Sequence, residues 1–424
     1  MNIQSFDVTI IGGGMVGLAL ACALKDSDLT VAVIEGKTPN LIPPKEHEIR
    51  VSALSQASKN LLTRIGAWPH IEASRHQPYQ SMLVWDKDSF GKIEFDARRV
   101  NTAASGEPSL GAIVENTIVQ AALWQVAEQA NNITLFHPFH CQSVAMGERE
   151  SWINLIGASD DNRTVTQSLT TKLVVGADGA NSWLRNQADI PLTSWDYGHH
   201  ALVATIETDL NHGNTARQVF LPEGPLAFLP LDNGDGEANL CSIVWSLTPE
   251  LAQELSQCDQ TQFNRRLTSA FDNRLGYCQV KSPRGVFPLK MRYARHFAKE
   301  RIALVGDAAH TIHPLAGLGV NLGFLDAGAL AQSILANHAQ GRDIGELANL
   351  RSYERWRKSE AMQMIAAMEG FKQLFSGDNP VKKLVRDVGL VAVDKVKPVK
   401  EAFVRHAMGL TDDLPDLAKP IIEP

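Results

Sequence analysis

The stretch FDVTIIGGGMVGLALACAL, residues 6–24, decides the fold of this chain. An apolar, β-branched run is followed at once by glycines and then by Ala and Leu residues, which predicts a strand, a glycine turn and a helix. Gly12 permits the tight turn, Gly14 lets a pyrophosphate approach the backbone, and Gly17 lets the helix pack closely on the strand. Free N–H groups at the start of the helix attract an anion. The stretch therefore predicts a dinucleotide-binding unit.

An acidic residue supports this prediction. A second expected strand, residues 29–34, ends in Glu35, eighteen residues after Gly17. A carboxylate at that strand end can accept hydrogen bonds from both hydroxyls of an adenosine ribose, and it would repel a 2′-phosphate. A glycine triplet alone is often only a turn, but the flanking strand, helix and acid make that alternative a minor one. FAD and NAD both remain open as the dinucleotide.

Length and composition exclude several other classes of protein. A chain of 424 residues is long enough for two or three domains. The net charge of −7 argues against a nucleic-acid partner. Five scattered cysteines form no pair at metal-ligand spacing, so we expect no metal site and reduced thiols in the cytoplasm. The sequence has no run of about eighteen apolar residues, so we expect no transmembrane helix.

Beyond Glu35 the chain departs from a simple alternation of strands and helices. Residues 81–85 and 92–95 have the alternating pattern of a hairpin, and residues 114–130 have helical spacing. Residues 201–287 are mostly strand-like, which favours an inserted antiparallel sheet that serves as a substrate platform. We expect its aromatic residues to be core rather than ligand contacts: Trp85, Phe95, Phe220, Phe228 and Trp245.

A second glycine-bearing region follows the strand expected at residues 301–305. Gly306 and Asp307 end that strand, where a carboxylate can bind a ribityl or ribose hydroxyl. Residues 314–321, with Gly317, Gly319, Val320 and Asn321, lead into a long helix whose start can take another negative charge. Arg50, which we expect to open a helical region, can reach a flavin ring or a phosphate. A solvated surface arginine is an equal alternative.

Three motifs carry a resemblance to a family: GGGMVG at residues 12–17, GADGANSWLR at 176–185 and GDAAH at 306–310. In this order they resemble the class A flavoprotein aromatic hydroxylases. A closer resemblance is to the UbiH/UbiF/VisC family of ubiquinone-biosynthesis hydroxylases, and within it to the VisC-type branch of 2-octaprenylphenol hydroxylases. The stretches that carry it are VWDKDSFG (84–91), WDYGHHALVATI (195–206), FLPL (228–231), GDAAHTIHPLAG (306–317) and RKSEAMQMIAAMEGF (357–371).

The resemblance implies an α/β fold with a discontinuous, Rossmann-like FAD-binding domain of the glutathione-reductase type. We expect this domain at residues 1–75, 108–190 and 288–365. An inserted, mostly antiparallel β-sheet substrate domain would occupy residues 76–107 and 191–287, and a C-terminal helical region residues 366–424. In the family, Asp178, Gly179 and Arg185 lie near both FAD and the incoming nicotinamide. Leu318 stands where the family usually has glutamine, so any hydrogen bond that the glutamine side chain makes in the family is lost here.

The resemblance also implies the chemistry. An unactivated aromatic carbon needs oxygen activated by a cofactor. In the family NAD(P)H reduces FAD, O₂ adds to give a C4a-hydroperoxide, and one oxygen passes to the ring of a polyprenylphenol. His310 and His313 can accept the phenol proton or orient the peroxide, although hydrogen bonding within the turn is an equal alternative. Pro314 matches a proline that faces the substrate in related hydroxylases.

Two other functions remain open: a non-catalytic flavin-binding subunit of a lipid-biosynthesis complex, and a flavin-dependent reductase of prenyl lipids. Residues 371–408 hold eight Lys/Arg and four acids among apolar residues, which favours peripheral contact with the inner face of the plasma membrane. A helix packed on the core is the alternative. Other ubiquinone-biosynthesis proteins are expected partners, and a homo-oligomer is compatible with the sequence.

Overall fold

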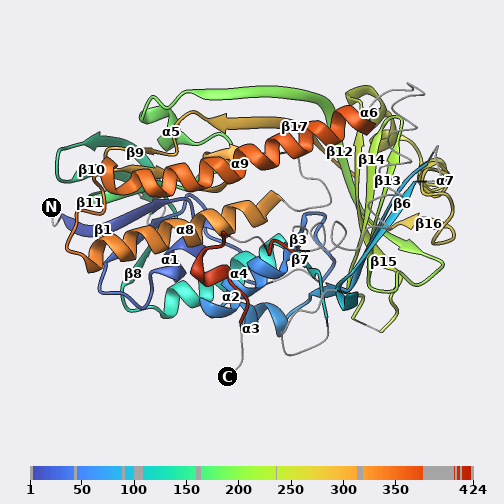
Figure 1. Ribbon diagram of the computed structural model, residues 1–424, viewed down its shortest axis with the longest axis horizontal. Coiled ribbons are helices and arrows are strands. Elements are labelled where there is room, and N and C mark those ends of the chain that lie inside the picture. Colours follow the sequence, from blue (N-terminus) through green and yellow to red (C-terminus); the bar gives the residue numbers. More distant parts are fainter. Residues whose placement is uncertain are drawn as a thin grey trace.

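The computed structural model describes residues 3–42, 45–87, 91–99, 108–158, 164–234, 236–312, 319–375, 405, 408–410 and 413–421. Two large sheets dominate it, one on each side of the molecule, and long ribbons and helices run between them (Figure 1). Among the described residues, no helix has a stretch long and apolar enough to cross a bilayer.

The first sheet has eight strands and carries the glycine motif. Its main path is β18-β19-β11-β1-β2-β8, in which the pairs from β19 to β8 are parallel, and β10 and β9 extend it in antiparallel fashion beside β11. The near-continuous Val, Ile and Leu of its central strands are buried on both faces, as parallel strands require. The strands are β1 (Gln4–Ile11), β2 (Val31–Ile34), β8 (Ile133–Phe136), β9 (Phe139–Met146), β10 (Ser151–Ala158), β11 (Thr164–Gly176), β18 (Ala298–Lys299) and β19 (Ile302–Leu304).

Helices pack beside this sheet and against one another. Helix α1 (Met15–Ala23) contacts both α4 (Asn116–Gln129) and α8 (Gly319–Ala339), and α8 contacts α9 (Leu347–Phe375). Their apolar faces share one core with the sheet. The remaining elements of this half are α2 (Gln56–Arg64), α3 (Trp68–Glu72), α5 (Trp183–Gln187) and a small sheet of β3 (Val51–Ser55), β7 (Gly111–Glu115) and β4 (Gln77–Tyr79).

The second sheet has nine strands in the order β20-β17-β12-β15-β14-β13-β5-β6, with β16 beside β12. All its pairs are antiparallel except β13 with β5. Trp85, Phe228 and Trp245 are buried in its core, as expected, while Phe95 and Phe220 are half-buried. Its elements are β5 (Ser81–Asp86), β6 (Lys92–Asp96), β12 (Leu192–Thr208), β13 (Thr215–Leu221), β14 (Gly224–Pro230), β15 (Leu240–Leu247), α6 (Pro249–Gln257), α7 (Gln260–Ala270), β16 (Cys278–Val280), β17 (Gly285–Ala294) and β20 (His310–Thr311).

The ribbon of β12 and β17 joins the two halves, and α9 runs beneath it (Figure 1). Ile365 of α9 packs with Tyr197 of β12 and Met291 of β17 in a small separate core. We predict a domain boundary after residue 287, and strand β17 runs from one side of it to the other. The boundary remains a prediction.

Two local expectations were wrong. Arg50 does not open a helix, because strand β3 intervenes before α2 begins at Gln56. The helix expected from Val114 begins only at Asn116, because Val114 is buried in β7, where it pairs with Ser52 of β3. The hairpin expected near residues 81–95 is confirmed as β5 and β6.

Candidate functional site

Four chain segments end together at one edge of the parallel sheet. Ile11 of β1 is in register with Ile34 of β2 on one side and with Gly176 of β11 on the other, and Gly176 is in register with Leu304 of β19. The carboxyl ends of parallel strands share one edge, where ligands of such sheets bind. The three motifs and Glu35 therefore meet there, although they lie far apart in the sequence.

The glycine turn has the form that the sequence predicts. Gly12 has φ +113°, and a Cβ atom there would collide with the carbonyl oxygen of Ala177. A Cβ atom on Gly17 would collide with the carbonyl oxygen of Gly12, so the helix packs against the turn. A Cβ atom on Gly14 would meet nothing within 4 Å, and no described side chain caps the helix that begins there. An anion can therefore approach the N-terminus of α1.

Glu35 lies against this turn. Its Oε2 accepts a hydrogen bond from the backbone N–H of Gly13 at 2.8 Å, and its Oε1 accepts one from the backbone N–H of Lys37 at 3.0 Å. A carboxylate has about four acceptor sites, so both oxygens can still accept from a ligand. The structure brings Glu35 and the glycine turn together as a dinucleotide site requires.

The GADGANSWLR segment packs beside the same turn. Gly179 has φ +80°. Asp178 accepts a hydrogen bond from the backbone N–H of Leu184 through Oδ2 at 3.1 Å, whereas its buried Oδ1 has no hydrogen-bond partner among the described residues. Arg185 is only 3% exposed, and its guanidinium donates to the carbonyl oxygens of Ala308 and Ala180. Burial lowers the pKa of Arg185, and Asp178 opposes this shift.

Asp307 occupies an accessible but enclosed position. Solvent reaches its side chain, yet the surrounding protein raises the pKa of its carboxyl above the usual value by burial. The charges of His310, Arg50 and Arg292 oppose this rise in pKa. Gly306, with φ +59°, sets the turn that presents it.

Arg50 and Arg292 are both near enough to influence Asp307. The exposed Arg50 lies over the ring of Phe287, 6.0 Å from its centroid. Arg292, on β17, pairs with Thr311 and was missed by the sequence analysis. The sequence around Arg292 does not mark it as a site residue, because only the pairing of β17 with β20 brings it to the site.

His310 belongs to both halves of the molecule. It follows the turn after β19, yet it forms part of β20 and pairs with Tyr293 of the second sheet. Its side chain is 3% exposed, and Nε2 lies 2.7 Å from Oδ2 of Asp326. Asp326 and its partner Arg357 were also missed, although a lone acid in the apolar stretch NLGFLDAGAL is a visible signal.

The start of α8 is fixed by Asn321. Its Oδ1 accepts hydrogen bonds from Ser55 and Ser58 at 2.9 and 2.7 Å, and its Nδ2 donates to Ala53 at 2.8 Å. The side chain of Asn321 thus holds α8 against β3 and α2. Gly319, Val320 and Asn321 would therefore bind a cofactor through their backbone groups. His313, Pro314, Gly317 and Leu318 lie outside the described residues.

The comparisons with known proteins agree with this geometry. The model of a family described as FAD binding domain matches residues 5–368. The 3-demethoxyubiquinol 3-hydroxylase of Escherichia coli (strain K12) is 34% identical over 411 residues, which cover 97% of this chain and all of that protein. The mitochondrial ubiquinone biosynthesis monooxygenase COQ6 of Danio rerio is 33% identical, with 95% of this chain and 90% of that protein covered.

Solved structures show the same fold. The p-nitrophenol 4-monooxygenase PnpA from Pseudomonas putida has a TM-score of 0.76 at 18% identity, covering 97% of this chain and all of that one. PqsL from Pseudomonas aeruginosa, described as a probable FAD-dependent monooxygenase, has a TM-score of 0.72 at 20% identity, covering 92% of this chain and all of that one. At these identities the likeness concerns the fold alone.

This chain belongs to the FAD-binding domain family and, within it, to the ubiquinone-biosynthesis monooxygenases. The predicted family, the α/β fold class and FAD as cofactor are confirmed. The residues present fit FAD: the open backbone at Gly14 suits a pyrophosphate, Glu35 suits a ribose, and the accessible, enclosed Asp307 suits a hydroxylated chain.

Proposed function

We propose that this protein hydroxylates the aromatic ring of a polyprenylphenol in ubiquinone biosynthesis, using FAD, NAD(P)H and O₂. One observation carries the proposal. Four segments end together at the carboxyl ends of the parallel strands, and the segment that contains His310 then pairs with the second sheet. Two relatives, a 3-demethoxyubiquinol 3-hydroxylase and a ubiquinone biosynthesis monooxygenase, support the pathway.

The chain's own residues would bind the cofactor from three sides. Glu35 would hold the adenosine ribose, the N-terminus of α1 the pyrophosphate, and Asp307 the ribityl chain. FAD supplies the electron transfer and the oxygen activation, which no side chain provides. The guanidinium groups of Arg50 and Arg292 add positive charge near Asp307, which favours anionic groups at the flavin end of the site.

His310 is the candidate acceptor of the phenol proton. A phenolate ring is richer in electrons than a phenol ring, so a base near the substrate favours attack on the ring. We expect the second sheet to serve as the platform for the substrate and to limit the access of water to the reaction. We propose that Asp178 and Arg185 affect the approach of the nicotinamide. We also propose that His313 and Pro314 lie beside the substrate.

Turnover with a short-chain prenylphenol tests this function. The purified FAD-loaded protein should oxidise NADH or NADPH and consume O₂ with formation of a product heavier by one oxygen atom, detected by mass spectrometry. NAD(P)H oxidation that forms a product heavier by two hydrogen atoms, without O₂ uptake, would instead support a prenyl-lipid reductase. No turnover with any prenylphenol would support a non-catalytic flavin subunit.

The polyprenyl tail also implies a location. We propose peripheral binding at the inner face of the membrane, or to other ubiquinone-biosynthesis proteins that deliver the lipid, through residues 371–408. Apart from the backbone of residues 371–375 and residues 405 and 408, this segment lies outside the described residues.

A further inference from the structure

A buried ionic network ties the turn that carries Asp307 to the two long helices. Asp326, in the middle of α8, is fully buried. Its Oδ2 accepts hydrogen bonds from Nε2 of His310 at 2.7 Å and from the backbone N–H of Gly306 at 3.0 Å. Its Oδ1 accepts one from Nε of Arg357, on α9, at 2.7 Å. One carboxylate therefore fixes the beginning and the end of the segment 306–310.

The protonation states follow from these contacts. Burial opposes the ionisation of Asp326, but His310 and Arg357 outweigh it and hold the pKa of the carboxyl below its usual value. An ionised carboxylate only accepts hydrogen bonds, so Nε2 of His310 must carry the proton. In neutral His310 the lone pair then lies on Nδ1, which has no hydrogen-bond partner among the described residues.

Stability alone does not account for this network. Arg357 is fully buried, and its Nη1 and Nη2 have no hydrogen-bond partner among the described residues. Buried ion pairs with unsatisfied donors are often less stable than apolar groups of the same volume. Their occurrence next to a candidate base points to a role in setting the state of that base.

We propose that Asp326 is a positioning residue: it fixes the Nε2–H tautomer of His310 so that Nδ1 can accept the hydroxyl proton of the phenol, and Arg357 holds the other oxygen of Asp326. The inference rests on the proposed hydroxylation, because that reaction supplies the proton. The phenol O–H bond breaks as the Nδ1–H bond forms, and the carboxylate of Asp326 stabilises the resulting imidazolium. The proton later returns to solvent.

Histidine nitrogen NMR tests the tautomer without any substrate. The chain has 13 histidines, so the His310 signals in ¹⁵N-histidine-labelled, FAD-loaded protein are assigned by their loss in His310→Gln. We expect Nε2 to be protonated and Nδ1 bare in the neutral form. In Asp326→Asn/Arg357→Met an amide that can also donate replaces the carboxylate, so the tautomers should mix or reverse. The double variant avoids leaving Arg357 as a buried, uncompensated charge.

Kinetics then test whether the tautomer matters. With FAD saturating, Asp326→Asn/Arg357→Met should lose about 10- to 100-fold in kcat for hydroxylation, while KM for the prenylphenol changes less than about threefold. A matched control is Arg301→Met/Asp343→Asn, which removes another arginine–carboxylate pair far from the site, between β19 and the loop after α8. It should lower thermal stability but leave the His310 tautomer and kcat unchanged.

The outcomes separate this inference from the proposed function. An unaltered His310 tautomer in the Asp326 double variant, or an altered one with wild-type kcat, would overturn the positioning role. A similar loss of kcat in the Arg301 double variant would overturn it as well, because the loss would then be general. If the wild-type protein has the expected tautomer but hydroxylates no prenylphenol, the proposed function fails and the geometric part of the inference stands.

Discussion

The guanidinium of Arg185 donates a hydrogen bond from Nη1 to the carbonyl oxygen of Ala308 at 2.9 Å, across 123 residues of sequence. Its Nη2 donates to the carbonyl oxygen of Ala180 at 3.0 Å. Arg185 therefore joins the GADGANSWLR segment to the turn that carries Asp307. A planar fork with several donors can make both contacts at once, and a lysine ammonium on a longer, flexible stem cannot reproduce that geometry.

This bridge predicts a combined defect in Arg185→Lys. We expect slower reduction of bound FAD by NAD(P)H and weaker FAD retention, because a buried carbonyl left without its donor costs about 1–3 kcal/mol. Asp178→Asn, which changes charge but not size, should slow reduction with less effect on FAD retention. Stopped-flow reduction and FAD titration measure the two steps separately. A wild-type reduction rate in either variant would remove that residue from the proposed nicotinamide role.

The acids at the strand ends should control cofactor affinity. Glu35→Gln removes a charged acceptor beside the glycine turn, and Asp307→Asn removes one beside Gly306. Hydrogen bonds to charged groups contribute about 1.5–3 kcal/mol, which corresponds to FAD binding weaker by roughly 10- to 100-fold. Fluorescence titration of the apoprotein with FAD gives the dissociation constants. Asp26→Asn, at a side chain that is 88% exposed, is the control and should bind FAD normally. Unchanged affinity in both test variants would contradict the placement.

The sequence predicts the strand, glycine turn and helix of the first motif, and the structure has all three. Gly12, Gly17 and Glu35 are recognised because strand, turn and helix follow one another in a single stretch, and backbone geometry requires those residue types there. The pairing of Asp326 with His310 and Arg357 joins residues on three different elements, so no local period reveals it. Arg292 reaches the site only because β17 and β20 pair. Side-chain networks of this kind depend on the packing of the whole fold.

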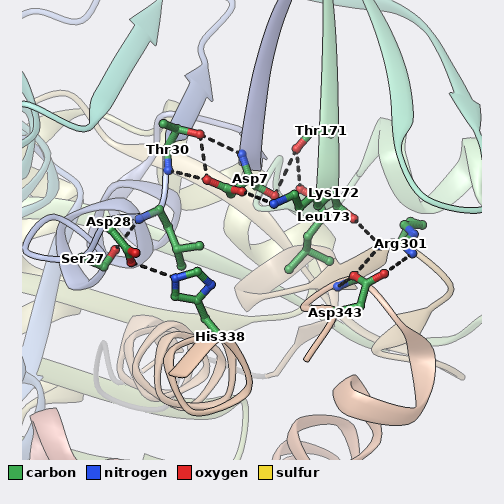
Figure 2. Close-up of polar contacts among 12 residues, drawn as sticks. Asp7, Ser27, Asp28, Thr30, Thr171, Lys172, Leu173, Arg301, His338 and Asp343 are labelled. Carbon is green, nitrogen blue, oxygen red and sulfur yellow. Dashed lines mark hydrogen bonds and ion pairs between the residues drawn. The ribbon is translucent and has the colours of Figure 1, made fainter. Parts of the chain in front are cut away.

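A second ionic cluster, at the opposite edge of the parallel sheet, predicts acid sensitivity (Figure 2). Arg301 is 3% exposed and forms a two-pronged ion pair with Asp343. Hydrogen bonds from Arg301, opposed by burial, hold the pKa of Asp343 below its usual value. A lowered carboxyl pKa in the folded state stabilises the protein above the unfolded-state pKa, and this contribution is lost as pH falls through the folded-state pKa.

Thermal unfolding from pH 6 to pH 3 therefore distinguishes Arg301→Met from the wild-type protein. The variant should have the lower Tm at pH 6. The difference should shrink as the pH falls below the usual aspartate pKa and towards the lowered folded-state pKa of Asp343. Lys419→Met breaks an exposed pair with Asp416 and should change Tm little at any pH. A difference between Arg301→Met and wild type that is constant over this pH range would show that the ion pair contributes nothing to acid sensitivity.

The last prediction concerns residues 371–408, where eight Lys/Arg and four acids give a local charge of +4 in a chain of net charge −7. A polyprenyl tail is nearly insoluble in water, so an enzyme that acts on it gains by binding at the bilayer surface. Basic residues near an anionic surface contribute about 1 kcal/mol each at low salt, and screening weakens this attraction. The wild-type protein should therefore float with anionic liposomes at low salt and less at moderate salt.

Charge reversal by Lys382/Lys383/Arg386→Glu should abolish flotation, because it converts attraction into repulsion. The control is Arg265/Arg266/Arg342→Glu, which changes the net charge equally at exposed positions elsewhere on the surface. That protein should float nearly as well as the wild type if binding is local to residues 371–408. Equal flotation of all three proteins, or none by any of them, would leave the segment as an ordinary part of the fold without a membrane role. Loss of flotation in both variants would assign the effect to net charge alone.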